Sequence, residues 1–249
     1  MLRGLWTLTW LEIKIFMREP LGAFGTIGVP VLLVLVMGRF LGAEARAGSA
    51  DAARYVSVGL PVLAAVLIAV GEVVSLVTII AIYREGGILK RLRATPLEPV
   101  TILTAHVLVK LLLTVVTLVL VAILARGAIP IALDWRLVRF GVALLIATSS
   151  IMALGFVIAS VVPTARFAQP VAGFLLWPMV AVSGLFAPLD AMPPALAAIA
   201  RVLPMTYAVS LLEGIWVGNP WSAHVRDITA LLVWLTVCTA VSGKVFRWE

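Results

Sequence analysis

Charged residues are scarce in this sequence, and cysteine is nearly absent. Asp, Glu, Lys and Arg make up 12% of the 249 residues, whereas about 25% of a soluble domain is charged. Hydrophobic residues make up 63% of the chain, against about 45–50% in a soluble domain. This balance excludes an ordinary soluble protein and predicts an integral membrane protein with little chain left for a separate soluble domain. The single cysteine, Cys238, cannot form a disulfide within the chain.

The motifs of common catalytic and nucleotide-binding sites are also missing. The chain has no GxxxxGK[ST] loop, no HExxH, no CxxC and no GxSxG. Its two histidines lie far apart in the sequence, so we predict no metal site and no cofactor bound by this chain. Catalysis within a membrane would need several polar groups at one depth. We therefore do not expect an enzyme. The net charge of +7 does not require nucleic acid, because basic residues also anchor membrane proteins.

The hydrophobic stretches predict an all-α, polytopic protein with one transmembrane domain over residues 1–249. A spanning helix needs roughly 20 apolar residues. We predict six spans, at residues 21–41, 56–82, 102–125, 140–162, 167–186 and 228–243. With both termini in the cytoplasm, all lysines fall inside, as the positive-inside rule favours: Lys14, Lys90, Lys110 and Lys244. The expected location is the cytoplasmic (inner) membrane of the cell.

Two segments outside the spans predict helices that lie at the membrane surface. In residues 1–18, a helix would place Arg3, Lys14 and Arg18 in one narrow sector, with Trp and aliphatic residues over much of the rest. The alternative is a positively charged lead-in to the first span. Residues 187–221 are intermediate in polarity and carry apolar residues at helical spacing, which predicts short amphipathic or re-entrant helices at the outer interface.

A polar island, residues 84–97, separates the second and third predicted spans. Its glycine pair can break the incoming helix, and Pro96 ends the segment. Apolar residues recur at helical spacing between them, beside basic ones. We therefore predict a short cytoplasmic helix that is presented to a partner, with plain anchoring of the basic cluster as the alternative. The candidate contact residues are Arg84, Glu85, Gly86, Gly87, Ile88, Leu89, Lys90, Arg91, Leu92, Arg93 and Pro96.

Glu72 is the acidic residue that falls deep within a predicted span. A carboxylate in the membrane is costly and often marks a transport pathway. The alternative is a structural role, in which Glu72 fixes helix packing through Ser75 or a residue of another span. His106 and Lys110 lie in the first turns of the third span, and we expect both to reach back to the cytoplasmic headgroups. A lone histidine there is more often an interface residue than a metal ligand.

Three stretches, taken together in this order and spacing, resemble a known family. They are Trp10-Leu-Glu-Ile-Lys14 with Met17-Arg-Glu-Pro20; the island from Tyr83 through Lys90-Arg-Leu-Arg93 to Ala94-Thr-Pro-Leu97; and Val182-Ser-Gly-Leu-Phe-Ala-Pro-Leu-Asp-Ala-Met-Pro193 with Pro204-Met-Thr-Tyr-Ala208. The likeness covers nearly the whole chain. It is similar to the membrane (permease) subunits of ATP-binding-cassette exporters of the type-2 family, and more to the drug-efflux branch than to polysaccharide exporters.

The resemblance implies a function that the residues alone do not give. The island would be the coupling helix that docks on a separate ATPase subunit, which would bind ATP and Mg. Residues 1–18 would be the interfacial connecting helix, and 187–207 the outer re-entrant helices. Two permease subunits, identical or related, would pair to export an amphipathic or hydrophobic drug, antibiotic or lipid. The alternatives are a self-contained channel or secondary carrier with Glu72 as its ion or proton site, and a membrane scaffold.

Overall fold

Helices form every regular element that the structure describes. The computed structural model describes residues 24–87, 99–124, 135–162 and 164–245, and singly Trp10, Ile13, Lys14 and Arg18. The α-helices are α3 (Val29–Arg46), α4 (Ala50–Arg54), α5 (Leu60–Glu85), α7 (Pro99–Leu124), α8 (Trp135–Val161), α9 (Ala165–Ala181), α10 (Pro194–Ala200), α11 (Pro204–Val217) and α12 (Val225–Val245). Short π and 3-10 turns are η1 (Phe24–Gly28), η2 (Tyr55–Gly59), η4 (Leu189–Ala191) and η5 (Trp221–His224). Within these ranges the predicted all-α class is confirmed.

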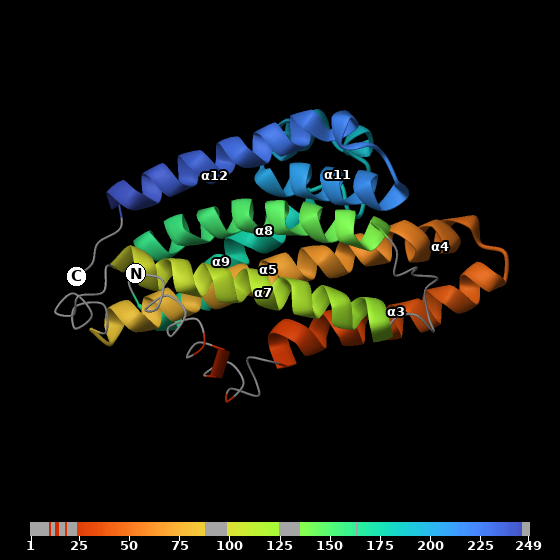
Figure 1. Cartoon of the computed structure of the whole chain (residues 1–249). Helices are drawn as coiled ribbons and strands as arrows, with labels where there is room; N and C mark the ends of the chain where they lie inside the picture. The colour runs from red at the N-terminus through yellow and green to blue at the C-terminus, as the bar shows by residue number, and fades with distance from the viewer. Residues whose placement is uncertain are drawn as a thin grey trace.

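The long helices run roughly along one axis, and α5 and α8 form the centre of the bundle (Figure 1). α5 packs against α3, α7, α8 and α9, while α8 also packs against α11 and α12. α5 runs from the end of the bundle that holds α4 to the opposite end, where α12 also finishes (Figure 1). We call these the α4 end and the Glu85 end. The core surrounds the two central helices, includes residues of α9 and α11, and is built mostly from aliphatic residues and alanine.

Four helices are long and apolar enough to cross a membrane, or five if the bent pair α10–α11 counts as one span. The four are 55–85, 104–124, 135–161 and 221–244. α9 has 17 residues, short of the roughly 20 that a span needs, and it ends at Ala181, five residues before the predicted boundary. α3 carries Arg39, Glu44 and Arg46 within its 18 residues. The prediction of several membrane spans is therefore confirmed, and the number six stays a prediction.

The polar residues between the first two predicted spans, where a loop would be expected at 42–54, are mostly helical. α3 continues to Arg46, a turn with Gly48 at φ 100° follows, and α4 begins at Ala50. α4 then runs through η2 into α5 without a loop. The polar residues of this stretch are compatible with helix, since an exposed helical hairpin can carry them on its solvent side. Polarity alone therefore gave no evidence of a loop.

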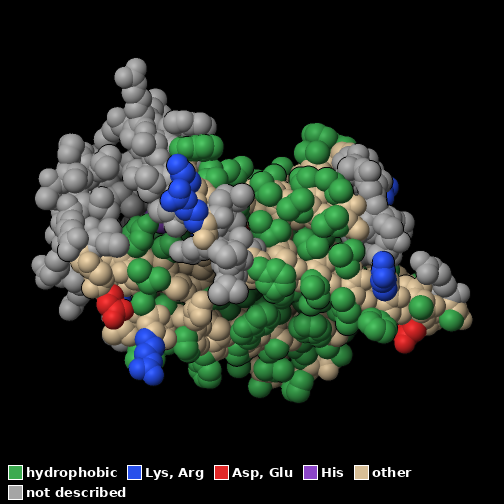
Figure 2. All heavy atoms as spheres, turned by 90° about the horizontal axis from the view of Figure 1, so that it is seen from below, with side chains coloured by type: hydrophobic (Ala, Val, Ile, Leu, Met, Phe, Trp, Pro, Cys, Tyr) green, Lys and Arg blue, Asp and Glu red, His purple; other side chains and the backbone are tan. Residues whose placement is uncertain are grey.

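The outer surface of the bundle is apolar along its middle. Figure 2 shows one face, on which hydrophobic side chains cover the centre and charged ones lie toward both ends. Exposed aliphatic residues recur along α7 and α12, for example Leu108, Leu112, Val233 and Val237. A soluble protein seldom exposes such a continuous apolar surface. The surface fits a bundle whose sides contact lipid or another membrane subunit.

Gly155 allows α5 and α8 to approach closely. A Cβ atom on Gly155 would lie 2.8 Å from Cγ1 of Val73, closer than carbon atoms pack, and the branched valine has few other rotamers. Small residues at such crossings let membrane helices pack closely.

We predict that Gly155→Ala lowers the free energy of unfolding by about 1–3 kcal/mol, as overpacking does, measured by SDS titration of the purified protein in mixed micelles. Gly71→Ala on α5 is the matched control, because a Cβ there would meet no atom within 4 Å. Equal stability of the two variants would contradict the close crossing of α5 and α8.

Candidate functional site

Two charged side chains fasten the end of α5 to the turn between α8 and α9. Nη1 of Arg84 donates hydrogen bonds to the carbonyls of Ala159 and Ser160, at 3.1 and 3.3 Å. Oε2 of Glu85 accepts the backbone N–H of Ala165 at 2.8 Å. A cation thus meets the C-terminus of α8 and an anion the N-terminus of α9, as both helix dipoles favour. We call these contacts the α5 clip.

The clip shifts the predicted boundary of the polar island. Arg84 and Glu85 belong to α5, and their side chains contact α8 and α9, with Glu85 still exposed at the surface. Gly86 caps the helix and Gly87 follows at φ 63°, a conformation that favours glycine. The helix therefore ends where the glycine pair predicts.

The other predicted contact residues lie outside the described part of the chain. These are Ile88, Leu89, Lys90, Arg91, Leu92, Arg93 and Pro96. Of the three basic residues predicted for an interfacial helix, Arg3 also lies outside it, whereas Lys14 and Arg18 are helical and exposed. Docking and interfacial roles stay predictions.

Glu72 forms a buried ion pair with Lys110 of α7. Oε2 of Glu72 lies 3.3 Å from Nζ of Lys110, and the same Nζ donates to Oγ of Ser75 at 2.7 Å. Glu72 is fully buried and Lys110 is 5% exposed. The pair lies 13 residues before the end of α5, about 20 Å along the helix at 1.5 Å per residue. It therefore joins α5 to α7 well inside the bundle.

The expectation that His106 and Lys110 reach the headgroups is wrong. His106 is 2% exposed, and its ring packs edge-on against Tyr83 of α5 with centroids 5.2 Å apart. Lys110, one turn further along α7, turns inward because an acidic partner is available there. Charged groups within membrane proteins usually face the interior and pair with one another, and Lys110 follows this pattern in place of snorkelling. Both residues thus add to the α5–α7 contact.

The pair Glu72–Lys110 predicts non-additive stability effects. Glu72→Met or Lys110→Met alone leaves an uncompensated buried charge and should cost about 3–5 kcal/mol of unfolding free energy. The double variant should cost much less than the sum, because it removes both charges.

The measurement is a double-mutant cycle by SDS titration. Lys244→Met serves as the control, since Lys244 is exposed at the end of α12, and should change stability by less than about 0.5 kcal/mol. Additive single effects would show that the two charges do not stabilise one another.

Side chains satisfy the carbonyls that the break between α10 and α11 leaves free. The two helices meet at 81°, and Pro204 starts the second. Thr206 donates to the carbonyl of Ala200 and Tyr207 to that of Arg201, both at 2.6 Å. Trp234 of α12 donates to the carbonyl of Val202 at 3.0 Å. Membrane helices tolerate such breaks only where the freed groups find partners. This explains the Pro-Met-Thr-Tyr sequence at 204–207.

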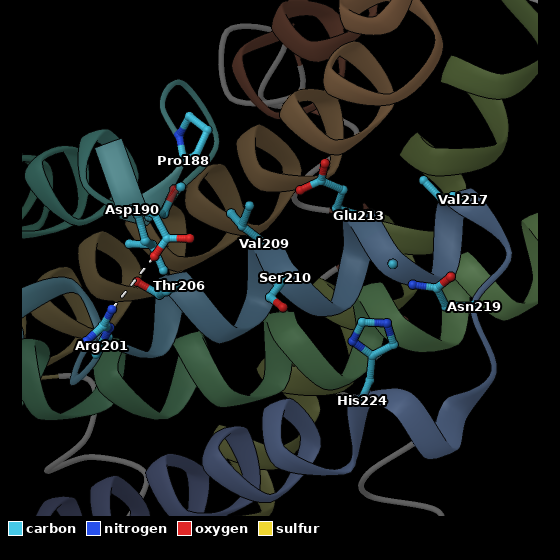
Figure 3. Close-up of a pocket in the computed structure, with 14 residues that line it drawn as sticks. Pro188, Asp190, Arg201, Thr206, Val209, Ser210, Glu213, Val217, Asn219 and His224 are labelled. Carbon is cyan, nitrogen blue, oxygen red and sulfur yellow. Dashed lines mark ion pairs between the residues drawn. The ribbon is translucent and has the colours of Figure 1, made fainter. Parts of the chain in front are cut away.

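A pocket of about 480 Å³ opens beside α11 at the α4 end of the bundle. Figure 3 shows Glu213 at one edge of α11 and Ser210 at the other edge, next to His224, with Thr206, Asp190 and Arg201 toward the start of the helix. Trp216 of α11 donates to the carbonyl of Ser57 in η2 at 2.6 Å, which fixes this helix near the start of α5. The pocket and the α5 clip therefore lie at opposite ends.

A hydrogen-bonded triad supports the wall of this pocket. Nδ1 of His224 lies 2.8 Å from Oδ2 of Asp227, and Oγ of Ser210 donates to the same oxygen at 2.9 Å. The imidazole packs directly over Gly214, where a Cβ atom would overlap the ring. Sequence reasoning missed these residues, although the i, i+3 spacing of His224 and Asp227 and the polar stripe on α11 were visible signals.

No curated protein matches the chain. A family model described as ABC-2 type transporter matches residues 3–217, which is most of the chain and includes the α5 clip, the pair Glu72–Lys110 and all of α11. By this match the chain belongs to the ABC-2 type transporter family of membrane proteins.

Proposed function

We propose that this chain is the permease subunit of an ATP-driven exporter, with its ATPase on a separate subunit. Membership of the ABC-2 transporter family supports a permease role. The sequence has no phosphate-binding loop of its own, so ATP and Mg would be bound by the partner. Two permease subunits, identical or related, would pair beside each other in the cytoplasmic membrane, with the termini and residues 84–97 facing the cytoplasm.

The α5 clip is the observation that carries this proposal. Most of the proposed coupling helix, residues 84–97, follows α5 in the sequence after Glu85. Arg84 and Glu85, at its start, join α5 to α8 and α9. A push on this segment would therefore move three helices together instead of bending one. Closure of the ATPase subunits on ATP would favour one arrangement of these helices over another, which is what a change of state requires. Export would follow along the interface between permeases.

The composition of the spans favours an amphipathic or hydrophobic substrate. The bundle faces that a second permease could cover expose aliphatic residues, for example Leu112 and Val233, and inside the bundle the charges of Glu72 and Lys110 neutralise one another. Such walls give little stabilisation to a small inorganic ion. A drug, an antibiotic or a lipid fits this environment better.

A self-contained carrier that uses Glu72 as its proton or ion site is the second candidate. Its best support is that Oε1 of Glu72 is buried without a hydrogen-bond partner among the described residues. The Lys110 ammonium at 3.3 Å weighs against it, because it occupies the place that a transported cation would take. Reconstitution of the chain alone separates the two proposals: ATP-independent flux that Glu72→Gln abolishes would establish the carrier.

Leu92→Asp tests docking of the coupling segment. An apolar side chain that fills a pocket on the ATPase would be replaced by a carboxylate, so the variant should lose co-purification of the ATPase subunit by about tenfold or more. Leu92→Met is the matched control and should retain it. Normal size-exclusion behaviour shows that the variant permease is folded, and full ATPase binding by Leu92→Asp would remove the docking assignment.

Glu85→Ala tests transmission through the clip. Loss of the contact with Ala165 at the start of α9 should reduce transport per ATP hydrolysed in proteoliposomes by roughly fivefold or more, as one lost charged hydrogen bond allows. Glu44→Ala on α3, which is exposed, is the control. A variant that transports normally would show that α5 and α9 need no direct link.

A further inference from the structure

The pocket beside α11 has a polar wall and an apolar wall. On α11, Thr206, Ser210 and Glu213 follow one another at intervals of three to four residues and face the pocket. The opposite side of the helix is buried in the core through Met205, Leu212 and Ile215. Pro188, Leu189 and Val209 supply apolar surface inside the pocket. Ligand sites of small molecules combine these features in volumes of about 300–1,000 Å³, and this pocket measures about 480 Å³.

Acceptors and negative charge are in excess among the groups that line the pocket. Arg201 lies 3.9 Å from Asp190, and both side chains are largely exposed at the rim. Asp190 is thus the counter-ion of Arg201, the arginine that lines the pocket. Glu213 makes no ion pair with any residue of the described ranges. A carboxylate without a counter-ion in a half-buried pocket favours a cationic ligand.

His224 supports the part of this wall that Ser210 and Gly214 form. The residue is 8% exposed, and its Nδ1 lies 2.8 Å from Oδ2 of Asp227, the oxygen to which Ser210 donates. Its Nε2 is buried against the backbone of Gly214, where a Cβ atom would overlap the ring, so α11 covers this nitrogen. The carboxylate of Glu213 is therefore the acceptor that this wall offers to a ligand.

We propose that this pocket binds the positively charged nitrogen of an amphipathic amine, with Glu213 as its counter-ion. The N–H groups of the ligand donate to the Glu213 carboxylate, and its apolar part packs on Pro188, Leu189 and Val209. Arg201 and Asp190 close the rim over it. The inference is independent of the proposed ATPase coupling, because it concerns the opposite end of the bundle and binding needs no nucleotide.

The test uses the full chain in phosphatidylcholine nanodiscs without an ATPase. Fluorescence anisotropy would measure binding of rhodamine 123, a cationic amine dye, and of fluorescein, an anionic dye on the same ring system, with empty nanodiscs subtracted. The wild-type chain should bind rhodamine 123 and prefer it to fluorescein by roughly tenfold or more, as loss of a charged contact implies.

Variants of Glu213 locate the site. Glu213→Gln should weaken rhodamine 123 binding by about tenfold or more, whereas Glu213→Asp, which keeps the charge, should lose less than about threefold. Glu44→Gln, a matched change at an exposed position of α3, should bind as the wild type. No binding to the wild type, an equal affinity for fluorescein, or unchanged binding by Glu213→Gln would each overturn the proposal. Evidence against ATPase docking by this chain would not contradict the proposed amine site.

Discussion

Polar groups inside this bundle have to be satisfied by other parts of the protein, because lipid offers neither hydrogen bonds nor counter-ions. Three sets of contacts among the described residues follow that constraint. Lys110 of α7 forms an ion pair with Glu72 of α5. Thr206 and Tyr207 donate hydrogen bonds to the carbonyls freed where α10 ends. Arg84 donates to a carbonyl at the end of α8, and Glu85 accepts a backbone N–H at the start of α9. Polar contacts therefore define which helices stay together.

The same constraint gives the bundle two distinct ends. At the Glu85 end, the α5 clip makes α5, α8 and α9 one unit directly before the segment that we propose to engage an ATPase. At the α4 end, α11 keeps a polar side that the core does not cover, and a pocket opens beside it. Between them, the pair Glu72–Lys110 holds α7 to the central helix. A force applied at one end can thus reach the other through packed helices, which is how coupling over such distances is carried.

The sequence predicted local features better than contacts. Hydrophobic length predicted α5, α7, α8 and α12 as spans, and the glycine pair after Glu85 predicted where α5 ends. The partners of charged residues were harder to predict, because they depend on which helices become neighbours. The pairing of Lys110 with Glu72 could have been predicted, because a lysine in one apolar helix and a glutamate in another are expected to pair. The target of Arg84 is the backbone of α8, which carries no signature in the sequence.

Rigid movement of α5 with α9 is the central claim, and spin labels test it most directly. In a chain that carries Gly86→Cys, Arg166→Cys and Cys238→Ala, nitroxides would report the separation of the two helix ends through dipolar broadening of the EPR spectrum. Spectra would be taken with the ATPase subunit in the absence of nucleotide and with ATP trapped. The same broadening in both states is the predicted result, because the clip keeps the ends together. A clear loss of broadening on ATP binding would contradict it, since α5 would then move away from α9.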